Sequence, residues 1–160
     1  ARPRTTICSP EDLADVDLEY PIIVKPVFGD NAEGLVVFDE PADLKRLRWR
    51  DSEAIVQEYR PGSGADLKLY VIDDFIAAVR RPSPISRCTA RSLGVVPVND
   101  ALRDVVKRVS AAFGLRFFGV DCLEVGGRLE VLEVNDFPNY SSVPNASELL
   151  AEHVLRRAVA

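Results

Sequence analysis

The sequence predicts an α+β fold in two lobes, residues 1–62 and 63–160. Short β-rich runs occur in successive pairs with turn residues between them, which predicts antiparallel hairpins. The segment 99–114 carries apolar residues at helical spacing. The Pro-Gly-Ser-Gly stretch at 61–64 has the composition of a linker. The chain therefore combines antiparallel sheets with a few helices, and the division between its lobes is expected near residue 62.

In the first lobe, a short helix is expected to begin at residues 9–12. Ser-Pro-Glu-Asp there supplies a capping serine, a proline at the first helical position and acids in the first turn. The runs PIIVK at 21–25 and GLVVF at 34–38 predict a hairpin with a long loop. A brief helix is expected from Pro41, and AIVQEY at 54–59 predicts a buried strand.

In the second lobe, LKLYVI at 67–72 and FIAAV at 75–79 predict a hairpin whose turn contains two aspartates. The segment 99–114 predicts an amphipathic helix that is capped by asparagine or aspartate and ends before glycine. The run 116–135 predicts a second hairpin around a Gly-Gly pair. Asn145, with a glutamate three residues later, is expected to begin a closing helix.

The composition excludes several classes of protein. With 20 Lys and Arg against 25 Asp and Glu, the net charge is -5, so no overall positive field would hold a nucleic acid. No apolar run reaches the roughly 20 residues of a bilayer span, so no membrane partner is expected and we expect a cytoplasmic protein. The cysteines, Cys8, Cys88 and Cys122, fit neither a disulfide framework nor a thiolate metal site. The single histidine, His153, is expected on the surface of the closing helix.

The segment 119–135 places polar groups in otherwise apolar strands. Asp121 lies in the first strand of the hairpin, and Glu133 and Asn135 lie two positions apart in the second, hence on one face. An aspartate, a glutamate and an asparagine side by side form an all-oxygen site, which suits Mg²⁺ or Mn²⁺ and not zinc. The same pattern also suits exposed residues on an edge hairpin.

The turn of this hairpin decides whether the three side chains meet. A two-residue turn at the glycines would pair Asp121 with Leu132 and send the aspartate to the opposite face. A three-residue loop would pair Asp121 with Glu133. We favour the three-residue loop because it gathers the apolar side chains of the hairpin, although it sets Glu124 opposite Glu130.

Positive charge gathers in one stretch of the chain. Residues 75–99 contain Arg80, Arg81, Arg87 and Arg91 and no acid. Because arginine binds phosphate and carboxylate through paired N–H donors, this stretch is a candidate anion site. A solvated basic loop is the alternative.

A glycine-containing loop, GDNAEG at 29–34, follows Lys25. Its glycines would let backbone N–H groups approach a phosphate, and the lysine would supply positive charge. The loop lacks the Lys-Ser/Thr ending of a P-loop and opens no helix, so neither Walker nor Rossmann chemistry is indicated. An ordinary hairpin loop is the alternative reading.

The order of these features is more specific than any one of them. A lysine strand, a glycine loop, the run VQEY with Asp66 and Lys68 after it, an arginine strand, GVD and LEVN follow one another. In this order the chain resembles the ATP-grasp superfamily, from about Tyr20 to the closing helix.

The resemblance implies two α+β lobes with antiparallel sheets that clasp ATP and magnesium. Residues 1–62 would carry the lid loop and the adenine hinge, and residues 63–160 the arginine strand and the magnesium site. The implied site residues are Lys25 on the phosphates, Gly29 and Gly34 in the lid, Gln57, Glu58 and Tyr59 at the adenine, Asp66 and Lys68 near the ribose and phosphates, Arg81 or Arg80 as the catalytic arginine on the transferred phosphate, and Asp121, Glu133 and Asn135 on Mg²⁺ or Mn²⁺.

Two branches of the superfamily compete for the function. QEY, GADLKLYVID and LEVNDFPN resemble the ligases that join glutamate or another amino acid to a peptide or protein through an acyl phosphate. Lys68 stands where those ligases usually have arginine, and the asparagine they carry after the arginine strand is not evident. RRPSPIS and NDFPNYSSVP resemble the inositol polyphosphate kinases, which usually have aspartate in place of Glu133. We favour the ligase because amide ligation is the commonest activity of the superfamily.

Proteins of this superfamily normally carry a further N-terminal domain, and the chain is expected to lack it. A piece of a longer enzyme and a non-catalytic nucleotide-binding domain are both consistent with that expectation. The expected partners are ATP and an anionic small-molecule or peptide acceptor. The sequence indicates no oligomeric state.

Overall fold

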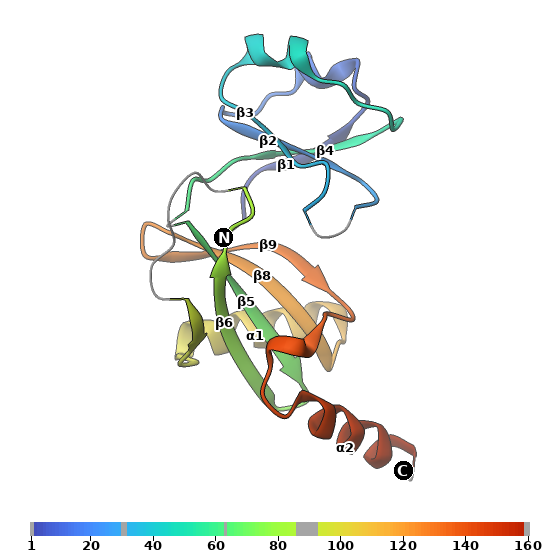
Figure 1. The fold of residues 1–160 in the computed structure, drawn as a ribbon, viewed down its shortest axis with the longest axis vertical. Helices are drawn as coiled ribbons and strands as arrows, with labels where there is room; N and C mark the ends of the chain where they lie inside the picture. Colours follow the sequence, from blue (N-terminus) through green and yellow to red (C-terminus); the bar gives the residue numbers. More distant parts are fainter. Residues whose placement is uncertain (1, 30–31, 63, 86–92, 159–160) are drawn as a thin grey trace. The chain divides into compact units, whose positions relative to one another are not determined.

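The computed structural model describes residues 2–29, 32–62, 64–85 and 93–158 of the chain (Figure 1). These residues form two compact units. The N-terminal unit contains residues 2–29, 32–61 and 84–85, and the C-terminal unit contains residues 62, 64–83 and 93–158. Within the described residues, none of the helices has the length and apolar character of a membrane span.

The N-terminal unit is built on a four-stranded antiparallel sheet in the order β1-β4-β2-β3. Its elements are β1 (Thr5–Cys8), the 3₁₀ helix η1 (Asp12–Asp15), β2 (Ile22–Pro26), β3 (Val36–Phe38), the 3₁₀ helix η2 (Pro41–Arg46) and β4 (Ala54–Glu58). One face of the sheet carries the core of this unit, formed by Leu13, Ile22, Val24, Phe38, Ala54 and Val56.

Two features of this unit differ from the sequence prediction. The helix expected from residues 9–12 is only the single 3₁₀ turn η1. Strand β1 was not predicted, although Thr5, Thr6 and Ile7 are β-branched residues that favour strands. It pairs with β4, Thr5 lying opposite Gln57, and so puts β4 in the interior of the sheet.

The C-terminal unit contains a five-stranded antiparallel sheet in the order β7-β6-β5-β8-β9. Its elements are β5 (Ala65–Ile72), β6 (Phe75–Pro82), β7 (Gly94–Val96), α1 (Asp100–Phe113), β8 (Phe117–Val125), β9 (Arg128–Asn135), the 3₁₀ helix η3 (Tyr140–Ser142) and α2 (Ala146–Ala158). Helix α1 packs on one face of this sheet, and η3 and α2 pack on the other. The short strand β7 was not predicted.

Helix α1 begins and ends at the expected residues. The Asn99 side chain accepts a hydrogen bond from the Leu102 N–H at 3.0 Å, which satisfies one donor of the first turn. Gly114 ends the helix in the left-handed conformation, with φ of 68°. Leu102, Val106 and Val109 are buried against the sheet. The predicted amphipathic helix is confirmed.

The hairpin of β8 and β9 has the predicted pairing of Asp121 with Glu133, but its turn differs from the predicted loop. Its turn has two residues, Gly126 and Gly127, both left-handed with φ of 55° and 75°, and the three-residue loop is wrong. A bulge leaves Leu132 as an extra residue of β9, because Cys122 pairs with Val131 while Asp121 pairs with Glu133. Asp121 and Glu133 therefore lie opposite each other after all. The two-residue turn also avoids the expected pairing of two glutamates, since leucines lie opposite both of them.

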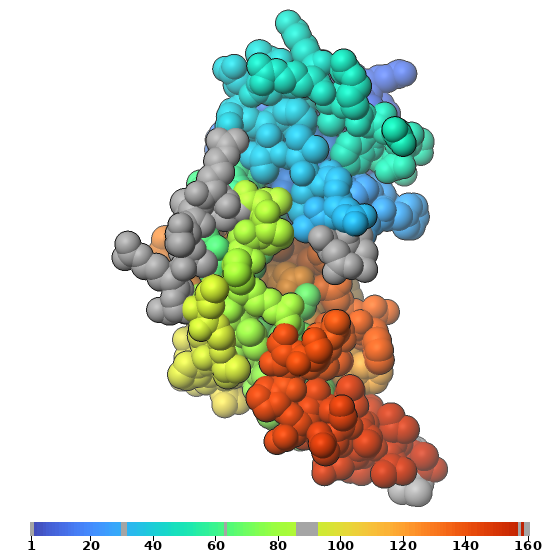
Figure 2. Space-filling view, viewed as in Figure 1, coloured from blue at the N-terminus to red at the C-terminus, as the bar shows by residue number. Residues whose placement is uncertain are grey.

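The closing helix α2 is attached to the sheet through a carboxylate. His153 is only 8% exposed, so its expected place on the helix surface is wrong. Its Nδ1 lies 2.6 Å from Oδ2 of Asp73, which occupies the β5–β6 turn with φ of 52°. Arg156 and Arg116 approach the same carboxylate at 3.6 and 3.8 Å. Helix α2 is the red C-terminal segment in Figure 2, and its residue Val154 is 61% exposed.

The Asp73 carboxylate is expected to stabilise the docking of α2 in a pH-dependent way. The hydrogen bond from His153 and the nearby positive charges hold the pKa of Asp73 below its usual value. The folded-state pKa is thus depressed, so the stabilisation is fully present at neutral pH and is lost as the pH falls below about 4. We expect Asp73→Asn to reduce the hydrogen-exchange protection of the α2 amides at pH 7 by about tenfold, as for the loss of a charged hydrogen bond.

Asparagine also adopts the left-handed conformation readily, so this substitution leaves the turn unstrained. The control is Asp74→Asn, at the exposed next position of the same turn, which should leave the hydrogen-exchange protection of the α2 amides unchanged. Hydrogen exchange measured for both variants at pH 7 and pH 3 checks the prediction. An Asp73→Asn effect equal at both pH values would contradict it.

Candidate active site

Polar side chains gather on one face of the C-terminal sheet. Strand alternation and the register place them on the face that η3 and α2 partly cover, opposite α1. One part of this face is apolar and packs against η3 and α2. The polar part carries six of the predicted site residues: Asp66, Lys68, Arg81, Asp121, Glu133 and Asn135.

Asp121 is the centre of this polar group. The Lys68 Nζ, on the neighbouring strand β5, lies 3.2 Å from both carboxylate oxygens of Asp121. The Asn135 Nδ2 donates to Oδ2 of Asp121 at 3.2 Å. The Lys68 and Asp121 side chains are 22% and 25% exposed, so the pair is accessible to a ligand. Glu133, directly opposite Asp121 in the hairpin, is exposed.

This donor set fits a hard divalent cation. Two carboxylates and an amide oxygen provide three oxygen ligands, and Mg²⁺ usually completes its shell with waters and phosphate oxygens. Among the described residues, His, Cys, Asp and Glu side chains form no group of three that could hold a metal, and the set around Asp121 combines two carboxylates with one amide. Cys122, next to Asp121, is buried on the opposite face, and burial raises its pKa to about 12. The thiol therefore stays protonated and supplies no ligand.

The two neighbouring arginines of β6 point to opposite faces. Arg81 lies on the polar face, where its Nη2 donates to Oγ of Ser142 and its Cζ is 5.8 Å from the ring centroid of Tyr70. Arg80 points to the α1 face, and its Nη2 lies 2.5 Å from Oε2 of Glu124. Of the two, only Arg81 shares a face with Asp121. The other arginines of the basic stretch, at positions 87 and 91, lie outside the described residues.

In the N-terminal unit, Lys25 and Gln57 are joined on the sheet face opposite the core. The Lys25 Nζ donates to Oε1 of Gln57 at 2.8 Å, and the Gln57 Nε2 donates to Oγ1 of Thr5 at 2.8 Å. This chain of hydrogen bonds crosses β2, β4 and β1 and orients the amide of Gln57. Sequence patterns did not indicate Thr5 as its partner, because β1 was not predicted.

The other residues of the predicted hinge are arranged differently. Glu58 lies on the core side of β4 and is 3% exposed. Arg60 approaches its carboxylate at 2.6 Å and Arg4 at 3.9 Å, so the buried charge is compensated. The Tyr59 N–H donates to the Pro21 carbonyl at 2.8 Å. Glu58 is thus buried on the core side of β4, whereas Gln57 shares the face of Lys25.

Both glycines of the predicted lid are required by the backbone or by packing. A Cβ at Gly29 would lie 2.7 Å from Cγ of Pro26, and Gly34 has φ of 74°. Phe28, beside them, is 95% exposed. Positions 30 and 31 of the loop lie outside the described residues.

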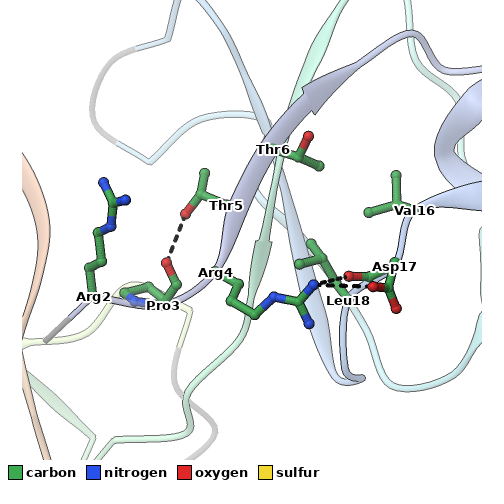
Figure 3. Close-up of a pocket in the computed structure, with 8 residues that line it drawn as sticks. All are labelled: Arg2, Pro3, Arg4, Thr5, Thr6, Val16, Asp17 and Leu18. Carbon is green, nitrogen blue, oxygen red and sulfur yellow. Dashed lines mark hydrogen bonds and ion pairs between the residues drawn. The ribbon is translucent and has the colours of Figure 1, made fainter.

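A cavity of about 490 Å³ lies along β1 (Figure 3). It is lined by Arg2, Pro3, Arg4, Thr5, Thr6, Val16, Asp17 and Leu18. The Arg4 guanidinium donates to the Asp17 backbone and side chain within it. None of the predicted site residues lines this cavity, and sequence patterns did not point to it.

Comparison with known proteins supports the sequence interpretation. The model of the RimK-like ATP-grasp domain matches residues 8–155. The chain belongs to the RimK-like ATP-grasp family. The predicted ATP-grasp fold, with α+β architecture and two antiparallel sheets, is therefore confirmed.

Curated relatives of this ATP-grasp chain include both a ligase and kinases. The tetrahydromethanopterin:alpha-L-glutamate ligase of Methanococcus maripaludis is 26% identical over 152 residues, which cover 86% of this chain and 52% of the ligase. Inositol-tetrakisphosphate 1-kinase 3 of Arabidopsis thaliana is 23% identical over 176 residues, which cover 91% of this chain and 50% of the kinase. The chain thus spans about half the length of the curated relatives it matches.

Solved structures share the fold at low identity. The ATP-grasp ligase PsnB, complexed with a minimal precursor, superposes with a TM-score of 0.67 at 24% identity over 98% of this chain and 55% of PsnB. The D-alanine-D-alanine ligase of Helicobacter pylori superposes with a TM-score of 0.64 at 13% identity over 95% of this chain and 56% of that ligase. These likenesses show the ATP-grasp fold.

The predicted metal ligands can be tested by binding. We expect Asp121→Asn to weaken the binding of Mn²⁺ in the presence of the ATP analogue AMPPNP. The Mn²⁺ affinity should fall at least about tenfold, because removing residues that only support metal ligands already lowers metal affinity by roughly 10–100-fold. The electron paramagnetic resonance signal of free Mn²⁺ measures it.

The matched control is Asp104→Asn, which removes an exposed carboxylate of α1. It should leave Mn²⁺ affinity unchanged. Equal affinities for the two variants would show that Asp121 is not a ligand.

Proposed function

We propose that the chain is the nucleotide- and metal-binding part of an ATP- and magnesium-dependent ligase that joins a carboxylate to an amine. The observation that carries this proposal is the single sheet face on which Asp121, Glu133, Asn135, Lys68 and Arg81 lie together. An all-oxygen metal site beside two cationic side chains is the combination that phosphoryl transfer needs.

Each side chain has a proposed role in binding. Asp121, Glu133 and Asn135 would hold Mg²⁺ or Mn²⁺, which when bound neutralises charge on the phosphates. Lys68 and Arg81 on the same face would bind phosphate oxygens through charge-assisted hydrogen bonds. Lys25 keeps the phosphate contact that the family resemblance implies, as a separate proposal. The remaining proposed contacts are those of Gln57, Tyr59 and the backbone of Glu58 with the adenine, of Asp66 near the ribose, and of the loop from Gly29 to Gly34 over the phosphates.

The proposed reaction needs no protein nucleophile. An acceptor carboxylate attacks the γ-phosphorus of ATP, a carboxylate O–P bond forms, and the bond to the ADP leaving group breaks. An amine then attacks the acyl carbon, the C–O bond to phosphate breaks, and the amine loses a proton to give an amide. Arg81 would stabilise the charge on the transferred phosphoryl group.

The acceptor class follows from the charges on this face and from related proteins. Cationic side chains favour an anionic acceptor, either a small molecule or a peptide. Solved complexes of PsnB contain a precursor peptide, which supports a peptide. We place the reaction in the cytoplasm, where ATP is available and thiols such as that of Cys122 stay reduced.

A kinase that phosphorylates an alcohol is the second candidate. Several curated relatives are inositol-tetrakisphosphate 1-kinases, at 22–25% identity. In that case a hydroxyl replaces the carboxylate as the attacking group, and the same metal and arginine serve the transfer.

Product analysis separates these functions. With Mg-ATP, a ligase releases ADP and free phosphate in equal amounts only when a carboxylate and an amine are both present. A kinase releases ADP with a stable phosphorylated alcohol and no free phosphate. We expect the ligase pattern across a panel of amino acids, peptides and inositol phosphates, and amine-independent transfer to a polyol would overturn it.

The same assay tests the role of Arg81. Arg81→Ala should lower kcat/KM by about 10²-fold or more, as for loss of a donor to a transition-state oxygen. The control Arg103→Ala, at an exposed position of α1, should leave kcat/KM unchanged. Binding of Mg-ATP without turnover on any acceptor would instead support a nucleotide-binding domain without catalysis.

A further inference from the structure

The guanidinium of Arg81 is held by side chains from two other elements. Its Nη2 donates to Oγ of Ser142 in η3, and its Cζ lies 5.8 Å from the ring centroid of Tyr70 in β5. We infer that Ser142 and Tyr70, with Tyr140 behind the ring, are positioning residues that set the orientation of Arg81 for the terminal phosphate of ATP. This inference rests on the proposed function, because it takes Arg81 as the arginine on that phosphate.

Support of this kind lets an arginine bind a phosphate more tightly. The side chain has several rotatable bonds, and fixing it costs rotamer entropy. When the protein fixes the side chain before the ligand binds, that entropy is no longer lost on binding. A donor already aimed at the developing charge is also the arrangement that stabilises a transition state best.

The aromatic support is rigid because it is buried. Tyr70 has no exposed surface and lies on the central strand β5, with the small residues Ala77 and Gly119 opposite it on the neighbouring strands. Its ring is tilted by 47° against the ring of Tyr140, with centroids 5.8 Å apart. Stacking on an aromatic face suits a guanidinium, whose planar charge interacts with the ring.

Tyr140 fixes the other side of this stack. Its hydroxyl donates to the Val71 carbonyl at 2.9 Å, which ties η3 to β5. Burial raises the pKa of Tyr140 to about 12, so the hydroxyl remains protonated and keeps donating. Tyr140 is 6% exposed, and its ring cannot swing away without opening the core of this face.

Ser142 belongs to the same 3₁₀ turn and is held by it. The Asn139 side chain accepts from the Ser141 N–H at 2.9 Å, and the Val143 N–H donates to the Tyr140 carbonyl at 2.8 Å. The segment that follows the proposed metal ligand Asn135 therefore also supplies the hydroxyl that orients Arg81. One stretch of chain links the metal site to the arginine.

Arg80 shows that this support is specific to one arginine. It is the neighbour of Arg81 in β6, but its guanidinium is paired with Glu124 on the opposite face. Of these two arginines, only the one on the proposed active face is held by a hydroxyl and an aromatic ring.

The test compares two nucleotides that differ at the terminal phosphate. Binding of Mg-AMPPNP and of Mg-ADP is measured by calorimetry for the wild type, Ser142→Ala, Ser142→Thr and the neighbouring control Ser141→Ala. We expect Ser142→Ala to weaken AMPPNP binding by about tenfold, as for a lost hydrogen bond to a charged group, and to leave ADP binding unchanged. Ser142→Thr should restore AMPPNP affinity, and Ser141→Ala should match the wild type for both nucleotides.

A double-mutant cycle shows whether Ser142 acts through Arg81. In an Arg81→Ala background, Ser142→Ala should cause no further loss of AMPPNP affinity. Independent, additive losses would overturn the inference, as would equal AMPPNP affinities of Ser142→Ala and Ser141→Ala. A wild type that binds neither nucleotide would instead overturn the proposed function and with it the role of Arg81.

The ring of Tyr70 can be tested separately. Within the described part of the chain its hydroxyl has no hydrogen-bond partner, so Tyr70→Phe keeps the ring and removes no bond. We expect Tyr70→Phe to keep the AMPPNP-to-ADP affinity ratio of the wild type, and Tyr70→Leu to lower it. A ratio unchanged in Tyr70→Leu would remove Tyr70 from the inference.

Discussion

The candidate site depends on one irregularity in the pairing of β8 with β9. Side chains alternate between the two faces of a sheet, so a shift of one residue moves every following side chain to the other face. The two-residue turn at Gly126 and Gly127 alone would send Asp121 away from Glu133. The bulge at Leu132 inserts the one residue that restores the pairing of Asp121 with Glu133. Because bulges recur next to active sites, where they redirect a side chain, this one is consistent with a functional role.

With that register, the two faces of the C-terminal sheet have different roles. The α1 face holds an apolar core, and the opposite face is divided between apolar packing under η3 and α2 and the polar group around Asp121. Lys68 reaches Asp121 from β5, while Ser142 of η3 reaches Arg81 of β6. The rigid strands thus place charged side chains, and the segment after β9 orients one of them. Such support from buried neighbours is what keeps a site in its productive geometry.

Much of this arrangement could be predicted from local sequence patterns. The cap and end of α1, the hairpins and the grouping of Asp121 with Glu133 follow from periodicity and turn residues. The reason given for that grouping was wrong, because a bulge replaces the three-residue loop and no local pattern predicts where an extra residue is placed. The choice between Arg80 and Arg81 needed the register of β6, which the sequence does not contain.

Other errors arose where tertiary contacts outweigh local preference. Strands β1 and β7 are short edge strands of four and three residues, and their hydrogen bonds come from partners distant in sequence. His153 lies in a helix whose sequence suggests an exposed position, yet Asp73 of a distant turn binds it. We propose that the polar face of β5, β6, β8 and β9 binds the metal and phosphates of ATP. A crystal structure with Mn²⁺ and AMPPNP, with anomalous scattering locating the manganese, tests this claim most directly. We predict a manganese peak bound by Asp121, Glu133 and Asn135 with Arg81 at the terminal phosphate, and a peak elsewhere in the protein would contradict the account.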